Sequence, residues 1–242
     1  MNLTDKTILV SGANRGIGRA TVDALLAEDV NKIYATARNT DDLPSFDDAR
    51  VVALQLDITD AASIENAAHI ANDVEVLVNN AGVLQIGSLL EQTDKEIEAN
   101  FATNFYGTLN VIRAFLPGLE SKNDASIVNV VTIAAFVNFP GFGSYSASKA
   151  ALFSLSQGIR TELAPRGISV HTVNPGPIDT DMTRDIPFDK ASVVETARNI
   201  VAGLKNGEED IFPDTGSKQM FDVWSGNYRD LERAVYDMHH AA

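Results

Sequence analysis

Apolar and polar positions follow two alternating patterns along most of the chain. Short apolar runs rich in valine and isoleucine predict buried β-strands, and the stretches between them place apolar residues three or four positions apart, as helices do. The runs lie at residues 7–11, 32–37, 51–57, 74–79, 125–132 and 168–174, with a shorter one at 210–213. Strands that alternate with helices predict an α/β, doubly wound, mostly parallel seven-stranded sheet with helices on both faces.

The helical stretches carry start signals. We expect helices over residues 17–28, 61–71, 94–118, 145–164 and 191–205, followed by two short helices near the C-terminus. Asp60 or Thr59 can cap the second helix, and Thr93 or Asp94 the third, because their side-chain oxygens accept hydrogen bonds from free backbone N–H groups.

Stop signals and the lack of linkers complete this outline. Pro117 marks the end of the third helix or a late kink, and Gly167 is a stop signal after the fourth. The sequence has no repeats, low-complexity tracts or Ser/Gly linkers. We therefore predict one domain that spans residues 1–242.

Composition and charge exclude several function classes. The formal net charge is −14, which argues against a nucleic-acid partner because such a partner needs a basic surface. The sequence has no cysteine, so disulfides and Cys-based zinc sites are excluded. Of the four histidines, only His239 and His240 are adjacent, and we interpret them as a solvated tail and predict no metal site. No apolar run is long enough to span a membrane and the N-terminus does not resemble a signal peptide, so we expect a cytoplasmic protein.

A glycine-rich turn follows the first strand. Residues 11–18 read Ser-Gly-Ala-Asn-Arg-Gly-Ile-Gly, and an amphipathic helix starts within them. A strand, a glycine turn and a helix N-terminus together form an anion site, because the backbone can approach a pyrophosphate closely. The alternative is an ordinary tight turn between strand and helix.

Two arginines bear on the choice of cofactor. The second strand ends at Ala37, where dinucleotide folds that bind a free ribose hydroxyl place an acid. Arg38 follows directly, and Arg15 lies inside the glycine turn, so two guanidinium groups can hold a 2′-phosphate. We therefore predict NADP(H) over NAD(H), with the alternative that Arg38 only caps a surface loop.

Candidate chemistry lies at the start of the helix predicted for residues 145–164. Tyr145 and Lys149 stand one helical turn apart on the same face. A charged ammonium beside a phenol is expected to lower the phenol pKa and allow proton exchange with a substrate oxygen. Thr132, at the end of the strand predicted for residues 125–132, supplies a hydroxyl. Such a Tyr-Lys pair also occurs by chance in surface helices.

Several motifs in the same order resemble the short-chain dehydrogenase/reductase superfamily. They are the glycine turn, Asp57, the Asn-Asn-Ala-Gly run at residues 79–82, the Tyr-Lys pair and the Pro-Gly-Pro-Ile run at residues 175–178. The resemblance extends from Lys6 to Met182 and implies a Rossmann-type fold.

The resemblance also implies a role for each candidate residue. Tyr145 would be the proton donor and acceptor, and Lys149 would lower its pKa and hold the nicotinamide ribose. Asn104 would support a proton-relay water. Thr132 stands where the family normally has serine; it keeps the hydroxyl but adds a methyl group.

The cofactor residues implied by the resemblance are spread along the chain, from the glycine turn to the segment after the sixth predicted strand. They are Gly12, Asn14, Arg15, Gly16, Ile17, Gly18, Arg38, Asp57, Ile58, Asn80, Ala81, Gly82, Tyr145, Lys149, Pro175, Gly176, Ile178 and Thr180.

The candidate substrate pocket is apolar, with no obvious arginine or lysine for a carboxylate. Its residues are Leu84, Ala134, Phe136, Phe142, Pro177 and Met182, with Ile86, Phe139 and Phe188 as further candidates. We therefore predict an NADPH-dependent reductase of a small hydrophobic ketone or aldehyde, or the reverse oxidation. Several of these residues can equally be core or lid residues.

Two departures leave alternatives open. The region 210–216 lacks the ending typical of 3-oxoacyl carrier-protein reductases, which argues against a housekeeping fatty-acid reductase. Thr132 leaves room for an NADP(H)-binding sensor or scaffold with a weak or inactive site. As in many relatives, the helices predicted at 94–117 and 145–164 could form a homodimer or homotetramer interface.

Overall fold

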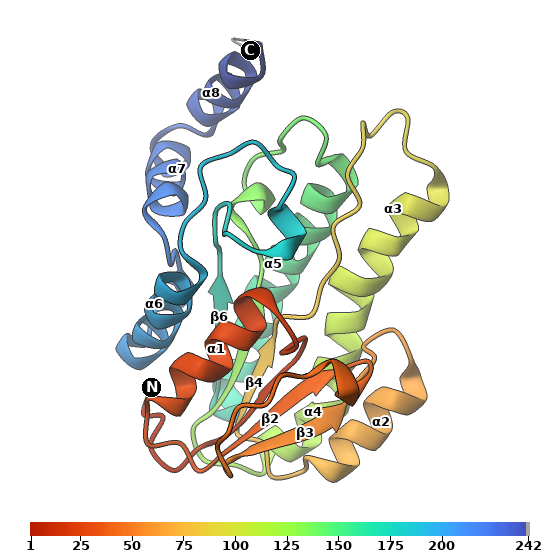
Figure 1. Ribbon diagram of the computed structural model, residues 1–242. Helices are drawn as coiled ribbons and strands as arrows, with labels where there is room; N and C mark the ends of the chain where they lie inside the picture. The colour runs from red at the N-terminus through yellow and green to blue at the C-terminus, as the bar shows by residue number, and fades with distance from the viewer. Residues whose placement is uncertain (241–242) are drawn as a thin grey trace.

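Seven parallel strands form the centre of the molecule, in the order β3-β2-β1-β4-β5-β6-β7 (Figure 1). The structure is a computed structural model that describes residues 1–240. The strands are β1 (Thr7–Val10), β2 (Lys32–Ala37), β3 (Val51–Gln55), β4 (Val76–Asn79), β5 (Ala125–Val130), β6 (Ile168–Val173) and β7 (Asp210–Ile211). The doubly wound prediction is confirmed, and every strand pair among the described residues is parallel, where the sequence predicted a mostly parallel sheet.

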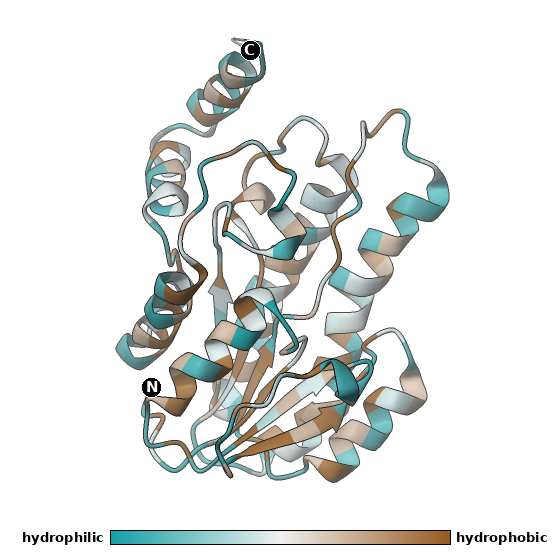
Figure 2. Ribbon diagram, viewed as in Figure 1, coloured by the Kyte–Doolittle hydropathy of each residue, from teal (hydrophilic) through white to brown (hydrophobic). Residues whose placement is uncertain are grey.

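Helices cover both faces of this sheet. They are α1 (Gly16–Leu26), α2 (Ala61–Ile70), α3 (Asp94–Phe101), α4 (Thr108–Glu120), α5 (Gly143–Leu163), α6 (Val193–Asn206), α7 (Thr215–Gly226) and α8 (Tyr228–His240). Leu9 packs toward α2, α4 and α5, whereas its neighbours Ile8 and Val10 pack toward α1 and α6. Figure 2 shows largely brown, hydrophobic strands between helices that carry both brown and teal residues. The strands are largely apolar because both faces of a parallel sheet are buried.

The helix starts agree with the capping chemistry of the sequence. Asp60 caps α2 by accepting from the backbone N–H of Ala62, so the choice between Asp60 and Thr59 goes to Asp60. Thr93 and Glu96 form a reciprocal capping box at α3. Gly167 has a φ of +71°, the left-handed conformation expected where a helix stops.

The long helix predicted for residues 94–118 is interrupted. A π-helical segment, Ala102–Gly107, separates α3 from α4. The prediction that this helix ends at Pro117 is wrong, because α4 continues to Glu120 with Pro117 inside it. Leu119, 1% exposed, packs into the core from this last turn, and its burial offsets the backbone hydrogen bond that proline cannot make.

The last two helices extend beyond the sheet. In Figure 1, α7 and α8 continue from α6 toward the C-terminus. Leu231 and Val235 of α8 are buried against Val137, with Trp224 packed beside them. Within residues 1–240, no helix is long and apolar enough to cross a membrane.

Candidate active site

The glycine turn joins β1 to α1 and leaves the start of the helix open. Gly12 and Gly16 have φ values of +66° and +57°, which favour glycine. A Cβ at Gly18 would lie 2.2 Å from the carbonyl oxygen of Gly12, so only glycine allows this close packing. Arg15 occupies the cap position of α1 without a side-chain hydrogen bond to the helix. The first N–H groups of α1 are therefore available to an anion.

Ser11 connects this turn to the end of β4. Its hydroxyl oxygen accepts hydrogen bonds from the backbone N–H groups of Asn80 and Ala81, each at 3.0 Å. The Asn80 amide donates to the carbonyl oxygens of Ser11, at 2.9 Å, and of Gly12, at 3.1 Å. The polar side chains that end β1 and β4 thus hold two loops side by side at the carboxyl edge of the sheet.

A groove of about 390 Å³ follows this edge. Its lining includes seventeen of the eighteen residues predicted to bind the cofactor; Gly18 is the exception, and it is buried in the turn. Thr132 and Met182 line the same groove. Ten further lining residues were not predicted, most of them next to predicted ones in the sequence, namely Ala37, Asp42, Leu56, Thr59, Val83, Thr103, Val130, Val131, Asp181 and Thr183. Four of them, Leu56, Thr59, Val83 and Val131, lie in loops, and the others lie at strand ends or in short helical segments whose place beside the groove no local motif indicates.

Arg15 and Arg38 both line this groove, but their surroundings differ. Arg15 is 65% exposed, and its Nη1 lies 3.7 Å from a carboxylate oxygen of Asp181. Arg38, among residues 1–240, forms no salt bridge and is exposed after β2. Burial opposes ionisation of Asp57, but hydrogen bonds from Thr59 and the nearby charge of Arg38 leave its pKa below the usual range. Of the two guanidinium groups, only that of Arg15 therefore has a carboxylate within salt-bridge distance among residues 1–240.

Tyr145 lies in the first turn of α5 and is half-buried. Burial raises the pKa of its phenol to about 12, and a hydrogen bond with Thr132 opposes that rise. The Thr132 hydroxyl donates to the carbonyl oxygen of Pro175 at 3.1 Å and accepts from the backbone N–H of Ala134 at 3.2 Å. The predicted pair of hydroxyls is therefore brought together, with Thr132 also holding the loop after β6.

Lys149 is buried beside the groove, and its expected effect on the phenol stays a prediction. Lys149 is 5% exposed, and its Nζ donates to the carbonyl oxygen of Val130 at 2.8 Å. Burial lowers the pKa of Lys149 to about 8, and it raises the pKa of the Tyr145 phenol to about 12. Both pKa changes have burial as their main cause, because a desolvated group is most stable uncharged.

Asn104 lies in the π-helical segment and is fully buried. Its side-chain oxygen accepts from the N–H of Val83 at 2.9 Å, while its amide donates to the carbonyl oxygen of Val83 and to the Ser148 hydroxyl, both at 3.0 Å. A Cβ at Gly82 would lie 3.1 Å from the Asn104 oxygen and 3.6 Å from the Lys149 nitrogen. The side chain of Asn104 therefore fixes the segment after β4 beside Lys149.

The nicotinamide-side run at residues 175–178 is held by a residue that the sequence reading did not single out. Asp214, which caps α7, accepts from the N–H of Gly176 at 2.9 Å and from the N–H and hydroxyl of Ser217 at 2.8 and 2.9 Å. A Cβ at Gly176 would lie 2.9 Å from the Asp214 carboxylate. Only its position before a helix could have drawn attention to Asp214.

The predicted substrate-pocket residues divide into two groups. Phe142 makes an edge contact with Tyr145, with ring centres 6.4 Å apart, and Phe139 lies 6.4 Å from Phe142 and 6.1 Å from Phe188. These rings continue outward from the phenol. Leu84, Ala134, Phe136, Phe142 and Pro177 do not line the groove itself.

Phe136 contacts a different set of rings. It packs against Phe153, Phe212, Phe221 and Trp224, at centre distances of 4.6 to 5.9 Å. The structure places it in an aromatic cluster that attaches the C-terminal segment to α5, and Ala134, 7% exposed, belongs to the buried core. A residue at the border of a pocket and a residue beneath it have the same apolar character in sequence, so periodicity does not separate them.

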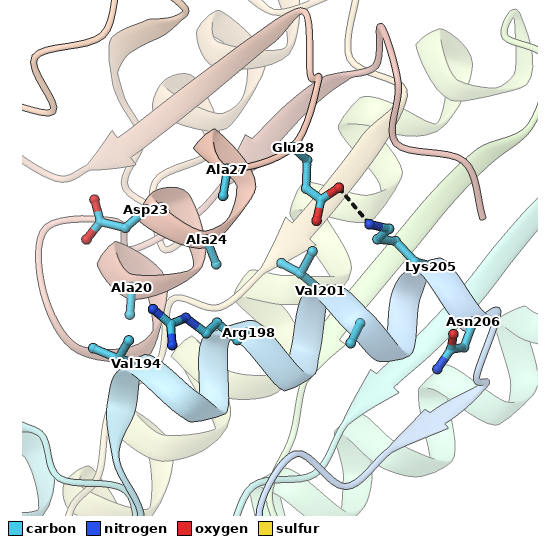
Figure 3. Close-up of a pocket in the computed structure, with 11 residues that line it drawn as sticks. Ala20, Asp23, Ala24, Ala27, Glu28, Val194, Arg198, Val201, Lys205 and Asn206 are labelled. Atoms are coloured by element: carbon cyan, nitrogen blue, oxygen red, sulfur yellow. Dashed lines mark hydrogen bonds and ion pairs between the residues drawn. The ribbon is translucent and has the colours of Figure 1, made fainter.

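A second hollow, of about 590 Å³, lies between α1 and α6 (Figure 3). Alanines and valines of the two helices form its floor, and an ion pair between Glu28 and Lys205, at 2.7 Å, closes one end. None of the candidate catalytic or cofactor residues lines it. Within residues 1–240, no group of three His, Asp or Glu side chains could hold a metal ion, and His239 and His240 are exposed.

A parallel sheet with a glycine turn at its carboxyl edge defines a dinucleotide-binding α/β protein. The short chain dehydrogenase family model matches residues 6–191, and the chain belongs to this family. It is therefore an NAD(P)-dependent oxidoreductase of the short-chain type.

Named relatives and solved structures agree with this assignment. The chain is 32% identical over 218 residues to the 3-oxoacyl-(acyl-carrier-protein) reductase FabG of Escherichia coli, covering 87% of this chain and 88% of that protein. A short-chain dehydrogenase from Burkholderia cenocepacia in complex with NADP superposes with a TM-score of 0.92 at 36% identity, over 97% of this chain and 99% of that chain. A short-chain dehydrogenase from Sphingobium yanoikuyae in complex with NADPH has a TM-score of 0.79 at 27% identity, over 93% of this chain and 94% of that chain.

Proposed function

We propose that this protein is an NADPH-dependent reductase of neutral, hydrophobic ketones or aldehydes, or oxidises the corresponding alcohols. One observation supports the proposal above the others: the hydroxyls of Tyr145 and Thr132 and the ammonium of Lys149 line one end of the groove that the glycine turn begins. A phenol, a hydroxyl and a cation at one point suit proton transfer to an oxygen.

The groove fits a dinucleotide. The free N–H groups at the start of α1 suit the pyrophosphate, and Gly12 and Gly16 let the backbone approach it. Arg38 and Arg15 would hold a 2′-phosphate, which favours NADP(H). The neighbours bound to NADP and NADPH support that preference. The bound cofactor supplies the hydride.

Tyr145 is the proposed proton donor. The phenol keeps its proton at neutral pH, and it lies at the end of the groove where an oxygen that gains negative charge can accept that proton. Thr132 accepts from Ala134 and donates to Pro175, so its hydroxyl must rotate away from the Pro175 oxygen before it donates to a substrate. Lys149 holds the positive charge that stabilises the phenolate left behind.

The surroundings of Tyr145 favour an uncharged, apolar substrate. The rings of Phe142, Phe139 and Phe188 lead outward from the phenol. Large apolar side chains on the segments beyond them are exposed, namely Ile86 at 54%, Leu89 at 48%, Leu90 at 96% and Met182 at 43%. A carbonyl compound with an apolar body would cover this surface.

A second candidate is the reduction of a 3-oxoacyl thioester. It is favoured by the identity to the 3-oxoacyl-(acyl-carrier-protein) reductase of Escherichia coli along most of both chains. The region 210–216, which runs from β7 through the Asp214 cap into α7, argues against the housekeeping form of that reaction. The sensor or scaffold alternative rests on Thr132 alone. A cytoplasmic location, a single domain and a homodimer or homotetramer stay predictions.

The test is an absorbance assay of NADPH oxidation. The panel contains neutral aliphatic and aryl ketones and aldehydes and one 3-oxoacyl thioester, with NADH in parallel and Tyr145→Phe as control. We expect turnover of an uncharged carbonyl, preference for NADPH and loss of turnover in the variant. Turnover only of the thioester selects the second candidate. Tight NADPH binding without turnover in either direction selects the sensor.

A further inference from the structure

Residues 83–87, here called the strap, lead from the cofactor groove to the surroundings of Tyr145. In Figure 1 the chain after β4 rises between α3 and α5. Asn104 holds Val83, which lines the groove. At the other end, the N–H of Gly87 donates to the carbonyl oxygen of Gly141 at 2.8 Å, and Gly87 pairs with Phe142 as a parallel bridge. Phe142 in turn contacts the ring of Tyr145.

A second buried asparagine holds the middle of the strap. Asn100 is fully buried in α3. Its side-chain oxygen accepts from the N–H of Gln85 at 3.1 Å, and its amide donates to the carbonyl oxygen of Gln85 at 3.3 Å. The same amide donates to the hydroxyl of Ser144 at 2.8 Å. Ser144 is fully buried and directly precedes Tyr145.

The contacts of Asn100 repeat those of Asn104 one helical turn earlier. Each asparagine exchanges both hydrogen bonds with one strap residue, and each donates to a serine on α5. The two serines, Ser144 and Ser148, are also one turn apart and directly precede Tyr145 and Lys149. Because a buried amide is costly unless it is paired, this arrangement fixes α3, the strap and α5 in one register.

We propose that Asn100 and Ser144 are positioning residues that hold the strap as the substrate-side wall of the site. Asn104 acts at Val83, inside the cofactor groove, whereas Asn100 acts at Gln85, between the groove and the Gly87–Phe142 bridge. Neither Asn100 nor Ser144 lines the groove. Their loss should therefore weaken substrate binding and leave cofactor binding unchanged. The kinetic part of this inference rests on the proposed reductase function.

The chain offers a matched control on the same helix. Ser156 of α5 is fully buried and accepts from the amide of Asn129 at 2.9 Å, just as Ser144 accepts from Asn100. Asn129 lies in the middle of the sheet and is also fully buried. Ser144→Ala removes the hydrogen bond from Asn100. Ser156→Ala removes the hydrogen bond from Asn129 and also the one that Ser156 donates to the carbonyl oxygen of Leu152, so the control is at least as disruptive. Asn129→Leu and Asn100→Leu form a second, more severe pair.

The first measurement is steady-state kinetics and NADPH binding for all four variants. We expect Ser144→Ala to raise the KM for the carbonyl substrate about fivefold, since about 1 kcal/mol corresponds to a factor near five. The Kd for NADPH and the kinetics of Ser156→Ala should stay within twofold of the unaltered protein. An unchanged KM in Ser144→Ala, or equal changes in both serine variants, overturns the proposal.

The second measurement does not depend on activity. Amide hydrogen exchange at Gly87 reports the strap without a change in that amide's own partner, the Gly141 oxygen. We expect exchange at Gly87 to become faster in Ser144→Ala, and faster still in Asn100→Leu, but not in either control. Unchanged exchange at Gly87 overturns the inference even if Asn100→Leu does not fold. If no carbonyl compound is turned over, the proposed function fails, whereas the exchange result still decides whether this pair holds the strap.

Discussion

The two ends of the cofactor groove are built in different ways. The end at α1 and β2 consists of backbone N–H groups and of the exposed Arg15 and Arg38. The end at α5 consists of side chains that are buried or half-buried, and Lys149 among them is 5% exposed. Local sequence determines the first end, because glycine and a helix start are sufficient to make it. Burial determines the second, since it raises the pKa of Tyr145 and lowers the pKa of Lys149.

Removal of the phenol hydroxyl should have the largest effect of these changes, and the effect should be confined to the α5 end of the groove. Tyr145→Phe is expected to reduce kcat by about 10²- to 10⁴-fold, the usual contribution of a positioned acid, and to leave the Kd for NADPH nearly unchanged. Single-turnover kinetics and a fluorescence titration of NADPH measure the two quantities. A comparable loss of cofactor affinity would show that the ends are not independent.

Loss of the Arg38 guanidinium should affect only the end of the groove at α1 and β2. Arg38→Ala is expected to lower the preference for NADPH over NADH by about ten- to a hundredfold, because a charge-assisted contact with the 2′-phosphate is removed. The ratio of kcat/KM values for the two cofactors measures this preference. Arg15→Ala is the control, with a smaller effect, since Arg15 already has Asp181 as a partner.

The buried ammonium predicts a pH dependence of stability. The pKa of Lys149 is about 8 in the folded protein and 10.5 in an exposed lysine, so the unfolded chain binds more protons between these values. The free energy of unfolding should therefore rise with pH across this window, by at most about 1.4 kcal/mol per pH unit from this group. Urea unfolding of the unaltered protein and of Lys149→Met, compared at several pH values, isolates this contribution. Identical slopes would mean that Lys149 is solvated.

A smaller effect is expected at Thr132. Thr132→Ser keeps the hydroxyl and removes a methyl group and the χ1 preference of a β-branched residue. The hydroxyl then turns more easily from the Pro175 oxygen toward a substrate, so we expect kcat to change about two- to fivefold upward. Thr132→Val, which keeps the shape and lacks the hydroxyl, is the control. A fall in kcat for the serine variant would assign the methyl group a positive role.

Most of the architecture and the cofactor end could be predicted from sequence. Largely apolar runs such as β4 and β5 are diagnostic because both faces of the sheet are covered, and the glycine turn has few other uses. The interruption at Asn104 could not be predicted, since the apolar spacing of residues 94–118 fits one helix. The protonation of Lys149 and the placement of Phe136 depend on segments distant in sequence, which only the folded chain brings together.

Asp214 has a consequence for the biosynthesis of the protein. Its carboxylate holds Gly176, and so connects the run at residues 175–178 to the cap of α7. A nascent chain that has left the ribosome only as far as α6 contains the glycine turn, Tyr145 and Lys149 but lacks this restraint. This restraint on the nucleotide groove therefore forms only after residue 214 and the first turn of α7 have emerged.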